Sequence, residues 1–317
     1  MILGAALFSV HRSMPLLNGL LFGLAIILTQ LLTPLVNALA TESVNQGKKL
    51  NFSAARAVGS IGYSVMSYSL GSLVSRKGIT VQPVAVVIVS IVFVMIIAVY
   101  PFRKKSHDTV DPAGEWQQDR SAPTAFFKRY RSFSRILIGC SFIYICHVPL
   151  NNFTYQIVVS KGGGSAEMGT AMALAAISEL LTMILFPVFL KKRGAGFWLG
   201  ISGIFYTLKA IGSLAAWNIL SFYAVQFLQP FGWGLMAVSS VYYTNQVMEE
   251  KDKIKGQAYM TMTLSIGNVF GALLGGALLD IVGVSGMIIF SIISGCVGTV
   301  IVMRTLSRDY SEFRRWL

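Results

Sequence analysis

The chain has 317 residues, of which 54% are hydrophobic and only 12% are charged, whereas soluble domains carry about 25% charged residues. This composition excludes a water-soluble fold, because the apolar residues form long stretches that match the roughly 20 residues a helix needs to cross about 30 Å of hydrocarbon. The net charge of +13 does not indicate nucleic-acid binding, since Lys and Arg are spread through the loops between these stretches.

The sequence predicts about nine membrane-spanning helices. In chain order we expect these spans at 15–40, 55–75, 80–101, 136–160, 168–190, 196–216, 218–245, 257–279 and 284–303. The segment 1–10 is apolar but resembles a signal peptide poorly, so we expect it to be the end of a further span. The expected fold class is therefore an all-α polytopic membrane protein.

Basic residues alternate between the two sides of the predicted membrane. One set of loops carries twenty Lys and Arg, eight of them in the loop 103–135, whereas the opposite set carries four. Short cytoplasmic loops hold an excess of positive charge, so the basic set and the C-terminus are predicted to be cytoplasmic. We expect a multi-pass protein of the plasma membrane, which in bacteria is the inner membrane.

A weak internal repeat relates two parts of the chain. The tripeptide Ser-Ile-Gly at 60–62 recurs at 265–267, and Gly78 matches Gly283 at the same offset of 205 residues. Two homologous halves arranged in parallel produce such a repeat.

The repeat and the uneven distribution of spans predict the domain organisation. Six spans follow the basic loop and three precede it, so we expect about the first three of twelve spans to be absent. The expected domains are the remainder of an N-terminal bundle at 1–102, a basic cytoplasmic loop at 103–135, and a C-terminal six-helix bundle with a tail at 136–317.

Six plus six spans around a basic central loop is the layout of the major facilitator superfamily, and short stretches of this sequence resemble it. Leu-Lys-Lys-Arg-Gly at 190–194 resembles its basic cytoplasmic loop. Pro-Leu-Val-Asn-Ala-Leu-Ala at 34–40 and Arg-Ala-Val-Gly-Ser-Ile-Gly at 56–62 resemble the oligosaccharide, nucleoside and phenylpropionate proton symporters, the branch that includes lactose permease. In the second half, 178–181, 208–213 and 228–232 follow the order of its eighth, ninth and tenth spans.

The resemblance implies a binding and coupling site. Arg56 stands where the branch has a sugar-binding arginine, and Glu179 where it has a glutamate that joins sugar binding to proton transfer. Where the branch has a second sugar-binding residue, a glutamate, this chain has Asn37. Lys209 stands where the branch has an arginine, and Gln229 stands where it has a histidine. These departures mean that the resemblance does not imply lactose itself.

The depth of charged residues in the spans gives an independent indication of a site. Glu179 lies about eleven residues into its span, roughly 17 Å down and near the midplane, where a charge is costly unless it meets a partner or water. Lys209 in the next span either pairs with Glu179 or extends its amine outward. By the resemblance, Gly232 stands where the branch has its proton-carrying carboxylate, so the branch's proton route applies to this chain only if Glu179 alone carries the proton. Trp233 can stack on a ring, and Asn152 can line a polar cavity or bond a neighbouring helix.

Other conspicuous residues are expected to be structural. Gly267, Gly271 and Gly275 recur every four residues, which allows two helices to approach closely. His147 lies in an apolar stretch and is expected to pack between helices rather than to relay protons. The candidate substrate-binding or coupling residues are therefore Glu179, Arg56, Lys209, Gln229, Asn37, Asn152 and Trp233.

The sequence thus predicts a secondary transporter that takes up a sugar or oligosaccharide, a nucleoside or an aromatic acid with protons by alternating access. Two alternatives stay open: a shortened chain that transports nothing, as a remnant or a late-started gene product, and an efflux antiporter for drugs or metabolites. No phosphate-binding loop, nucleophile motif or metal-ligand spacing is present, so we expect no cofactor and no enzyme activity. The expected partners are a solute, protons and the lipid bilayer, with a monomer as the expected state and no nucleic acid.

Overall fold

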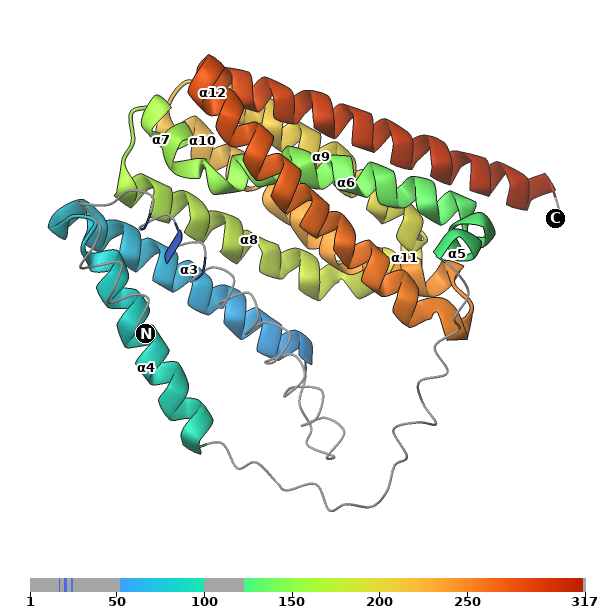
Figure 1. Ribbon diagram of the computed structural model, residues 1–317, viewed down its shortest axis with the longest axis horizontal. Helices are drawn as coiled ribbons and strands as arrows, with labels where there is room; N and C mark the ends of the chain where they lie inside the picture. The colour runs from blue at the N-terminus through green and yellow to red at the C-terminus, as the bar shows by residue number, and fades with distance from the viewer. Residues whose placement is uncertain (1–16, 18–19, 22–23, 25–51, 100–122, 316–317) are drawn as a thin grey trace. The chain divides into compact units, whose positions relative to one another are not determined.

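The computed structural model describes residues 17, 20, 21, 24, 52–99 and 123–315, and all regular secondary structure in these ranges is helical (Figure 1). This confirms the all-α prediction. Most of the predicted span 15–40, including Asn37, lies outside the described residues. The helices are α3 (Phe52–Lys77), α4 (Val81–Val99), α5 (Pro123–Arg129), α6 (Arg131–Asn152), α7 (Thr154–Ser160), α8 (Ser165–Lys192), α9 (Ala195–Ala215), α10 (Ile219–Gln226), η1 (Pro230–Gly234), α11 (Leu235–Val247), η2 (Glu250–Asp252) and α12 (Lys253–Arg315).

Helix lengths and composition fit a membrane protein. Four helical segments in the described part of the chain are long and apolar enough to cross a membrane: Val81–Val99, Arg131–Asn152, Ala195–Ala215 and Glu250–Ser307. The last of these contains two predicted spans, because α12 breaks at Gly283, where φ is 74° and ψ is −173°. The two arms of α12 turn back on each other at this break (Figure 1).

The predicted internal repeat has a structural counterpart at its turns. Gly78, which directly follows α3, has a φ of 83°, and Gly283 at the equivalent position has a φ of 74°. Glycine adopts such positive φ values without the steric cost that a Cβ adds. Both copies of the repeat therefore end a long helix with a glycine in the same backbone region.

The chain forms two compact units. The smaller one comprises 1–50 and 76–128, and the larger one comprises 51–75 and 129–317. In the smaller unit, α4 has no buried residue, although its sequence is almost entirely apolar. The larger unit contains α6 to α12 and most of α3, and the candidate site lies within it. The expected three-domain division remains a prediction.

Part of the predicted central loop is helical. Within residues 123–135, α5 and the first turn of α6 are separated by Tyr130 alone. Pro123 begins α5 at a position where its missing N–H is not needed by the helix. Phe133 in the first turn of α6 is buried, so an apolar contact holds this highly charged stretch against the larger unit.

Two predicted spans are interrupted. The span 136–160 is divided at Phe153 into α6 and α7, with Pro149 inside the last turn of α6. The span 218–245 is divided into α10, the π-helical segment η1 and α11, with Pro230 at the start of η1. Proline removes a backbone donor and so favours such breaks.

Both arms of α12 pack on α6 through glycines. A Cβ at Gly267 would lie only 2.3 Å from the Cβ of Tyr144, and one at Gly271 2.9 Å from the Cβ of Val148. On the second arm, a Cβ at Gly298 would lie 2.6 Å from the carbonyl oxygen of Gly139. The predicted packing role of Gly267 and Gly271 is confirmed, as is that of Gly275, where a Cβ would lie 2.8 Å from the Cβ of Pro149.

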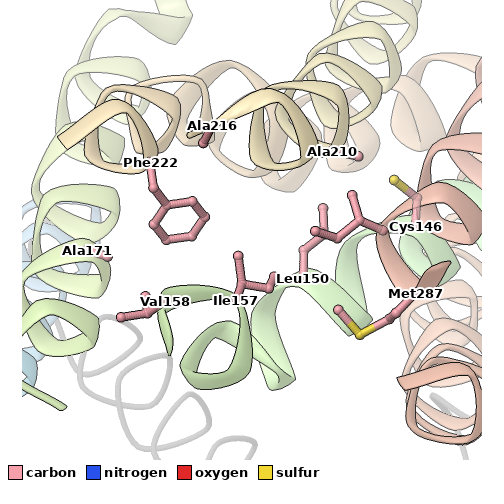
Figure 2. Close-up of a cluster of buried hydrophobic side chains, with 10 residues drawn as sticks. Cys146, Leu150, Ile157, Val158, Ala171, Ala210, Ala216, Phe222 and Met287 are labelled. Atoms are coloured by element: carbon pink, nitrogen blue, oxygen red, sulfur yellow. The ribbon is translucent and has the colours of Figure 1, made fainter. Parts of the chain in front are cut away.

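A buried hydrophobic cluster joins the helices of the larger unit (Figure 2). Its apolar side chains come from α6, α7, α8, α9, α10 and α12, and Ala216 follows α9. The cluster contains Cys146, Leu150, Ile157, Val158, Ala171, Ala210, Ala216, Phe222, Met287 and Ile288.

A polar network ties the start of α6 to the connection between α11 and α12. The Tyr130 hydroxyl donates to Oδ2 of Asp252 at 2.7 Å and accepts from the backbone N–H of Glu249 at 3.3 Å. Arg129 forms an ion pair with Glu249. Burial, together with the hydrogen bond to Asp252, raises the pKa of the Tyr130 phenol.

Candidate functional site

Three of the predicted site residues meet in the larger unit. Lys209 on α9 donates from Nζ to Oε1 of Gln229 at 2.5 Å, and Gln229 donates from Nε2 to Oε1 of Glu179 on α8 at 3.0 Å. We call this arrangement the Glu179–Gln229–Lys209 chain. The carboxylate and the ammonium are thus connected through one side-chain amide rather than by direct contact.

Burial makes this chain energetically significant. Lys209 and Gln229 are each only 6% exposed, and Glu179 is partly buried. A buried charge carries a large desolvation cost unless hydrogen bonds and an opposite charge compensate for it. An amide can accept at one end and donate at the other, so Gln229 satisfies both charges at once. Lys209 therefore lies in the interior, and the alternative in which its amine extends outward is wrong.

The local backbone explains how Gln229 reaches both partners. After α10, the N–H groups of Phe227 and Leu228 bond to carbonyl oxygens three residues back, at 3.2 and 3.0 Å, which tightens the chain. Gln229 then precedes Pro230 and the wider π-helical turn. Single π-helical turns inside α-helices often occur at functional sites.

An aromatic cluster adjoins the Glu179–Gln229–Lys209 chain. The rings of Trp233 and His147 stack with centroids 5.2 Å apart and an interplanar angle of 25°. His147 also meets Tyr206 edge-on at 4.9 Å, and Tyr144 approaches Trp233 edge-on at 6.3 Å. Tyr206 lies one helical turn before Lys209 on α9, so the aromatic cluster and the charged chain share a helix.

Two polar atoms of this cluster have no hydrogen-bond partner in the described part of the chain. They are Nδ1 of His147 and the hydroxyl of Tyr206, on side chains that are 5% and 1% exposed. A buried polar group without a partner costs about 1–3 kcal/mol. The sequence pattern did not single out Tyr206, and it predicted a packing role for His147. The position of Tyr206, one helical turn before Lys209, is the feature of the sequence that could have identified it as a site residue.

The helix α3 packs against α8 near this site. The hydroxyl of Ser64 donates to the carbonyl oxygen of Ala173 at 3.0 Å, and a Cβ at Gly169 would lie 2.4 Å from the carbonyl oxygen of Ser67. Tyr63 on α3 is 51% exposed and lies within electrostatic range of Glu179.

The remaining predicted residues are not part of this arrangement as described. Asn152 is the last residue of α6 and has an exposed side chain. The backbone of Arg56 belongs to α3, but its side chain lies outside the described residues, as does all of Asn37. Trp233 joins the cluster through its stacking on His147.

The chemistry of these residues fits binding and proton exchange. The arrangement offers one carboxylate, one ammonium, an amide and an aromatic surface. Across the described ranges, no group of three His, Cys, Asp or Glu residues is placed to hold a metal ion. A carboxylate joined to an ammonium through an amide can gain or lose a proton as its surroundings change.

Comparison with protein families gives a match to the model described as the MFS_1 like family, over residues 1–291. This range includes every residue of the site described above. No curated protein matches the chain.

Proposed function

Because the chain belongs to the MFS_1 like family of the major facilitator superfamily, and is therefore a multi-pass membrane transporter rather than an enzyme, we propose that it takes up a small organic solute together with protons. The observation that carries this proposal is the Glu179–Gln229–Lys209 chain, which places an ionisable carboxylate and its counter-charge among the helices. Ionisable groups at such positions of membrane proteins are characteristic of proton and substrate pathways.

Glu179 is the proposed proton acceptor. When its carboxylate takes up a proton, the negative charge that balances Lys209 disappears. The hydrogen bond from Gln229 then loses its charge-assisted character. Proton binding thereby changes the free energy of the site, and it can bias the two access states if they differ in their affinity for the proton.

The transport cycle follows from this linkage. The two halves rock around the site, which opens to each side in turn. Solute binding and protonation of Glu179 are coupled through Gln229 and Lys209, so each favours the other. Arg56, Asn37 and Asn152 remain predicted contributors to solute binding.

The expected placement in the cell completes the proposal. The excess of Lys and Arg in one set of loops supports a cytoplasmic C-terminus in the plasma membrane. In this orientation the transporter moves a sugar or oligosaccharide, a nucleoside or an aromatic acid inward as a monomer.

Uptake by a transport-deficient bacterial host tests the proposal. Lactose, uridine and phenylpropionate are offered at external pH 6 and pH 8, with expression of each variant verified by immunoblot. Wild-type protein is expected to take up at least one solute faster at pH 6, and Glu179→Gln is expected to lose this acceleration. Glu167→Gln is the matched control, because Glu167 lies on the same helix and caps the backbone N–H of Gly164 instead.

The outcomes separate the alternatives. Acid-accelerated uptake that persists in Glu179→Gln would remove Glu179 from the mechanism. A wild-type protein that is well expressed but takes up none of the solutes would favour the non-transporting alternative. Dye accumulation in cells that lose the protein would favour efflux.

A further inference from the structure

We propose that an anionic phospholipid binds in a groove between the two arms of α12, with its phosphate at Arg135 and Arg304 and an acyl chain along the exposed face of α6. This inference is independent of the proposed transport function. It is carried by an apolar groove floor that ends at two exposed arginines, neither of which forms an ion pair among the described side chains.

One face of α6 forms the floor of the groove. Arg131, Arg135, Ile138 and Phe142 are spaced three or four residues apart, so their side chains share one face of the helix. All four are exposed, and Ile138 is 54% exposed although most of the neighbouring residues of α6 are buried. The floor therefore changes from apolar to basic toward the start of α6.

The two arms of α12 form the walls of the groove. The first arm contacts α6 at Tyr144 through Gly267, and the second arm contacts it at Gly139 through Gly298. At 3.6 residues per turn, the floor face of α6 lies between these two contact faces. The arms diverge from the break at Gly283, and the beginning of α6 lies between them (Figure 1).

The groove is closed at the end near the break. Pro149 follows Phe142 by seven residues and so continues the same face, but it is buried against Gly275 of the first arm. From Arg135 to Pro149 the floor rises by fourteen residues, roughly 21 Å at 1.5 Å per residue. The acyl chains of one leaflet occupy about 15 Å, half of the hydrocarbon core, so the groove is long enough for one of them.

The two arginines lie at the same level on neighbouring helices. Gly139 lies against Val302 of the second arm, which runs antiparallel to α6. Toward the start of α6, Arg135 precedes Gly139 by one turn, and Arg304 follows Val302 by two residues. Val297 lies seven residues before Arg304 on the same face of the second arm and is 40% exposed. An apolar strip thus leads to an arginine on both helices.

The charges at this end of the bundle favour an anionic headgroup. Other basic residues here have carboxylate partners, as Arg129 has in Glu249, whereas Arg135 and Arg304 have none among the described side chains. The predicted spans begin at 136 and end at 303, which places both arginines at the depth of the headgroups. A guanidinium binds phosphate through two parallel hydrogen bonds, and basic pockets between membrane helices bind acidic headgroups.

Native mass spectrometry of the detergent-purified full chain tests the inference. The protein is titrated with phosphatidylglycerol or with phosphatidylcholine of the same acyl chains, and the dissociation constant of the first bound lipid is measured. Each basic residue near an acidic headgroup strengthens binding about fivefold. Wild-type protein is therefore expected to bind phosphatidylglycerol about 25-fold more tightly than phosphatidylcholine, because two arginines contribute.

Single substitutions locate the phosphate. Arg135→Gln and Arg304→Gln are each expected to lower the preference for phosphatidylglycerol about fivefold, and the double variant is expected to abolish it. Arg135→Lys keeps the charge and is expected to keep most of the preference. Arg193→Gln is the matched control: it removes the same charge from an exposed side chain, but the Arg193 guanidinium lies over the ring of Phe197 on α9, 5.5 Å from its centroid. Its preference is expected to equal that of wild type.

Four results would overturn the inference. Equal affinity of wild-type protein for the two lipids would refute the selectivity, and an unchanged preference in the double variant would refute the site. A loss in Arg193→Gln as large as that in Arg135→Gln would mean that overall charge attracts the lipid. Displacement of phosphatidylglycerol by an equal concentration of glycerol 3-phosphate would mean that the groove contributes nothing and that a soluble phosphate compound is the ligand. Melting temperatures in the same detergent verify folding, which these exposed substitutions are expected to preserve.

Discussion

Replacement of Gln229 by leucine gives a quantitative test of the amide bridge. Gln229→Leu preserves the approximate side-chain volume but removes two hydrogen bonds, one from the Lys209 ammonium and one to the Glu179 carboxylate. Hydrogen bonds to charged groups contribute about 1.5–3 kcal/mol each, so the expected loss in the free energy of unfolding is about 3–6 kcal/mol. The loss is large because Lys209 stays buried after its acceptor is removed.

Gln226→Leu provides a matched control for this measurement. Gln226 lies one turn earlier and is also buried, at 3% exposure, but its Nε2 bonds only to the uncharged carbonyl oxygen of Phe222, at 3.3 Å, among the described residues. Its replacement is expected to cost about 1 kcal/mol. Both variants are compared by reversible unfolding in mixed micelles at pH 7. If Gln229→Leu proves no less stable than Gln226→Leu, the amide bridge does not hold the two charges.

Three further outcomes follow from the packing and from the polar network. Gly267→Leu is expected to destabilise the protein by about 1–3 kcal/mol, because its Cβ would lie 2.3 Å from Tyr144. Gly276→Ala is expected to have little effect, because the atom nearest to its Cβ would be 3.4 Å away. Thermal unfolding in detergent compares the two variants, and equal melting temperatures would contradict the close helix contact. Tyr130→Phe is expected to cost about 1 kcal/mol through loss of the hydrogen bond to Asp252, and denaturant unfolding at pH 7 that matches wild type would count against it. The raised pKa of Tyr130 means that the folded protein holds the phenolic proton more tightly than the unfolded chain does. The contribution of this phenol to the free energy of unfolding is therefore complete below pH about 10 and is lost as the pH rises further. Above that pH, the stability of Tyr130→Phe is expected to decline less steeply than that of the wild-type protein.

The sequence predicts the helices well because their existence depends on local chemistry. A helix that crosses hydrocarbon needs a long apolar stretch, and the lengths of α3, α4, α8 and α9 follow those stretches closely. The turn glycines Gly78 and Gly283 were visible as a repeat because a positive φ strongly favours glycine. These features need no knowledge of which helices are neighbours.

The helix breaks could not be located from apolar length alone. Pro149 and Pro230 are visible in the sequence, but a proline can kink a helix, end it or widen one turn, and the neighbouring packing decides between these outcomes. The π-helical turn that follows Gln229 is a widened turn of this kind, and the presence of Pro230 alone does not predict it.

The site was predicted in its components but not in its connections. The depths of Glu179 and Lys209 suggested that they could attract each other, yet depth does not determine which helix faces meet. The bridging role of Gln229 depends on the interrupted helix, and the unpartnered atoms of His147 and Tyr206 become evident only when the contacts around them are known.

Solute-driven proton entry into liposomes tests the central claim, that Glu179 couples solute uptake to protons. The full chain is reconstituted with a pH-sensitive dye inside the liposomes, and lactose, uridine and phenylpropionate are added in turn. Wild-type protein is expected to acidify the interior with at least one solute, whereas Glu179→Gln is expected to exchange that solute without acidification. Acidification by Glu179→Gln at the wild-type rate would contradict the account. A wild-type protein that exchanges the solutes but acidifies the interior with none of them would contradict it equally.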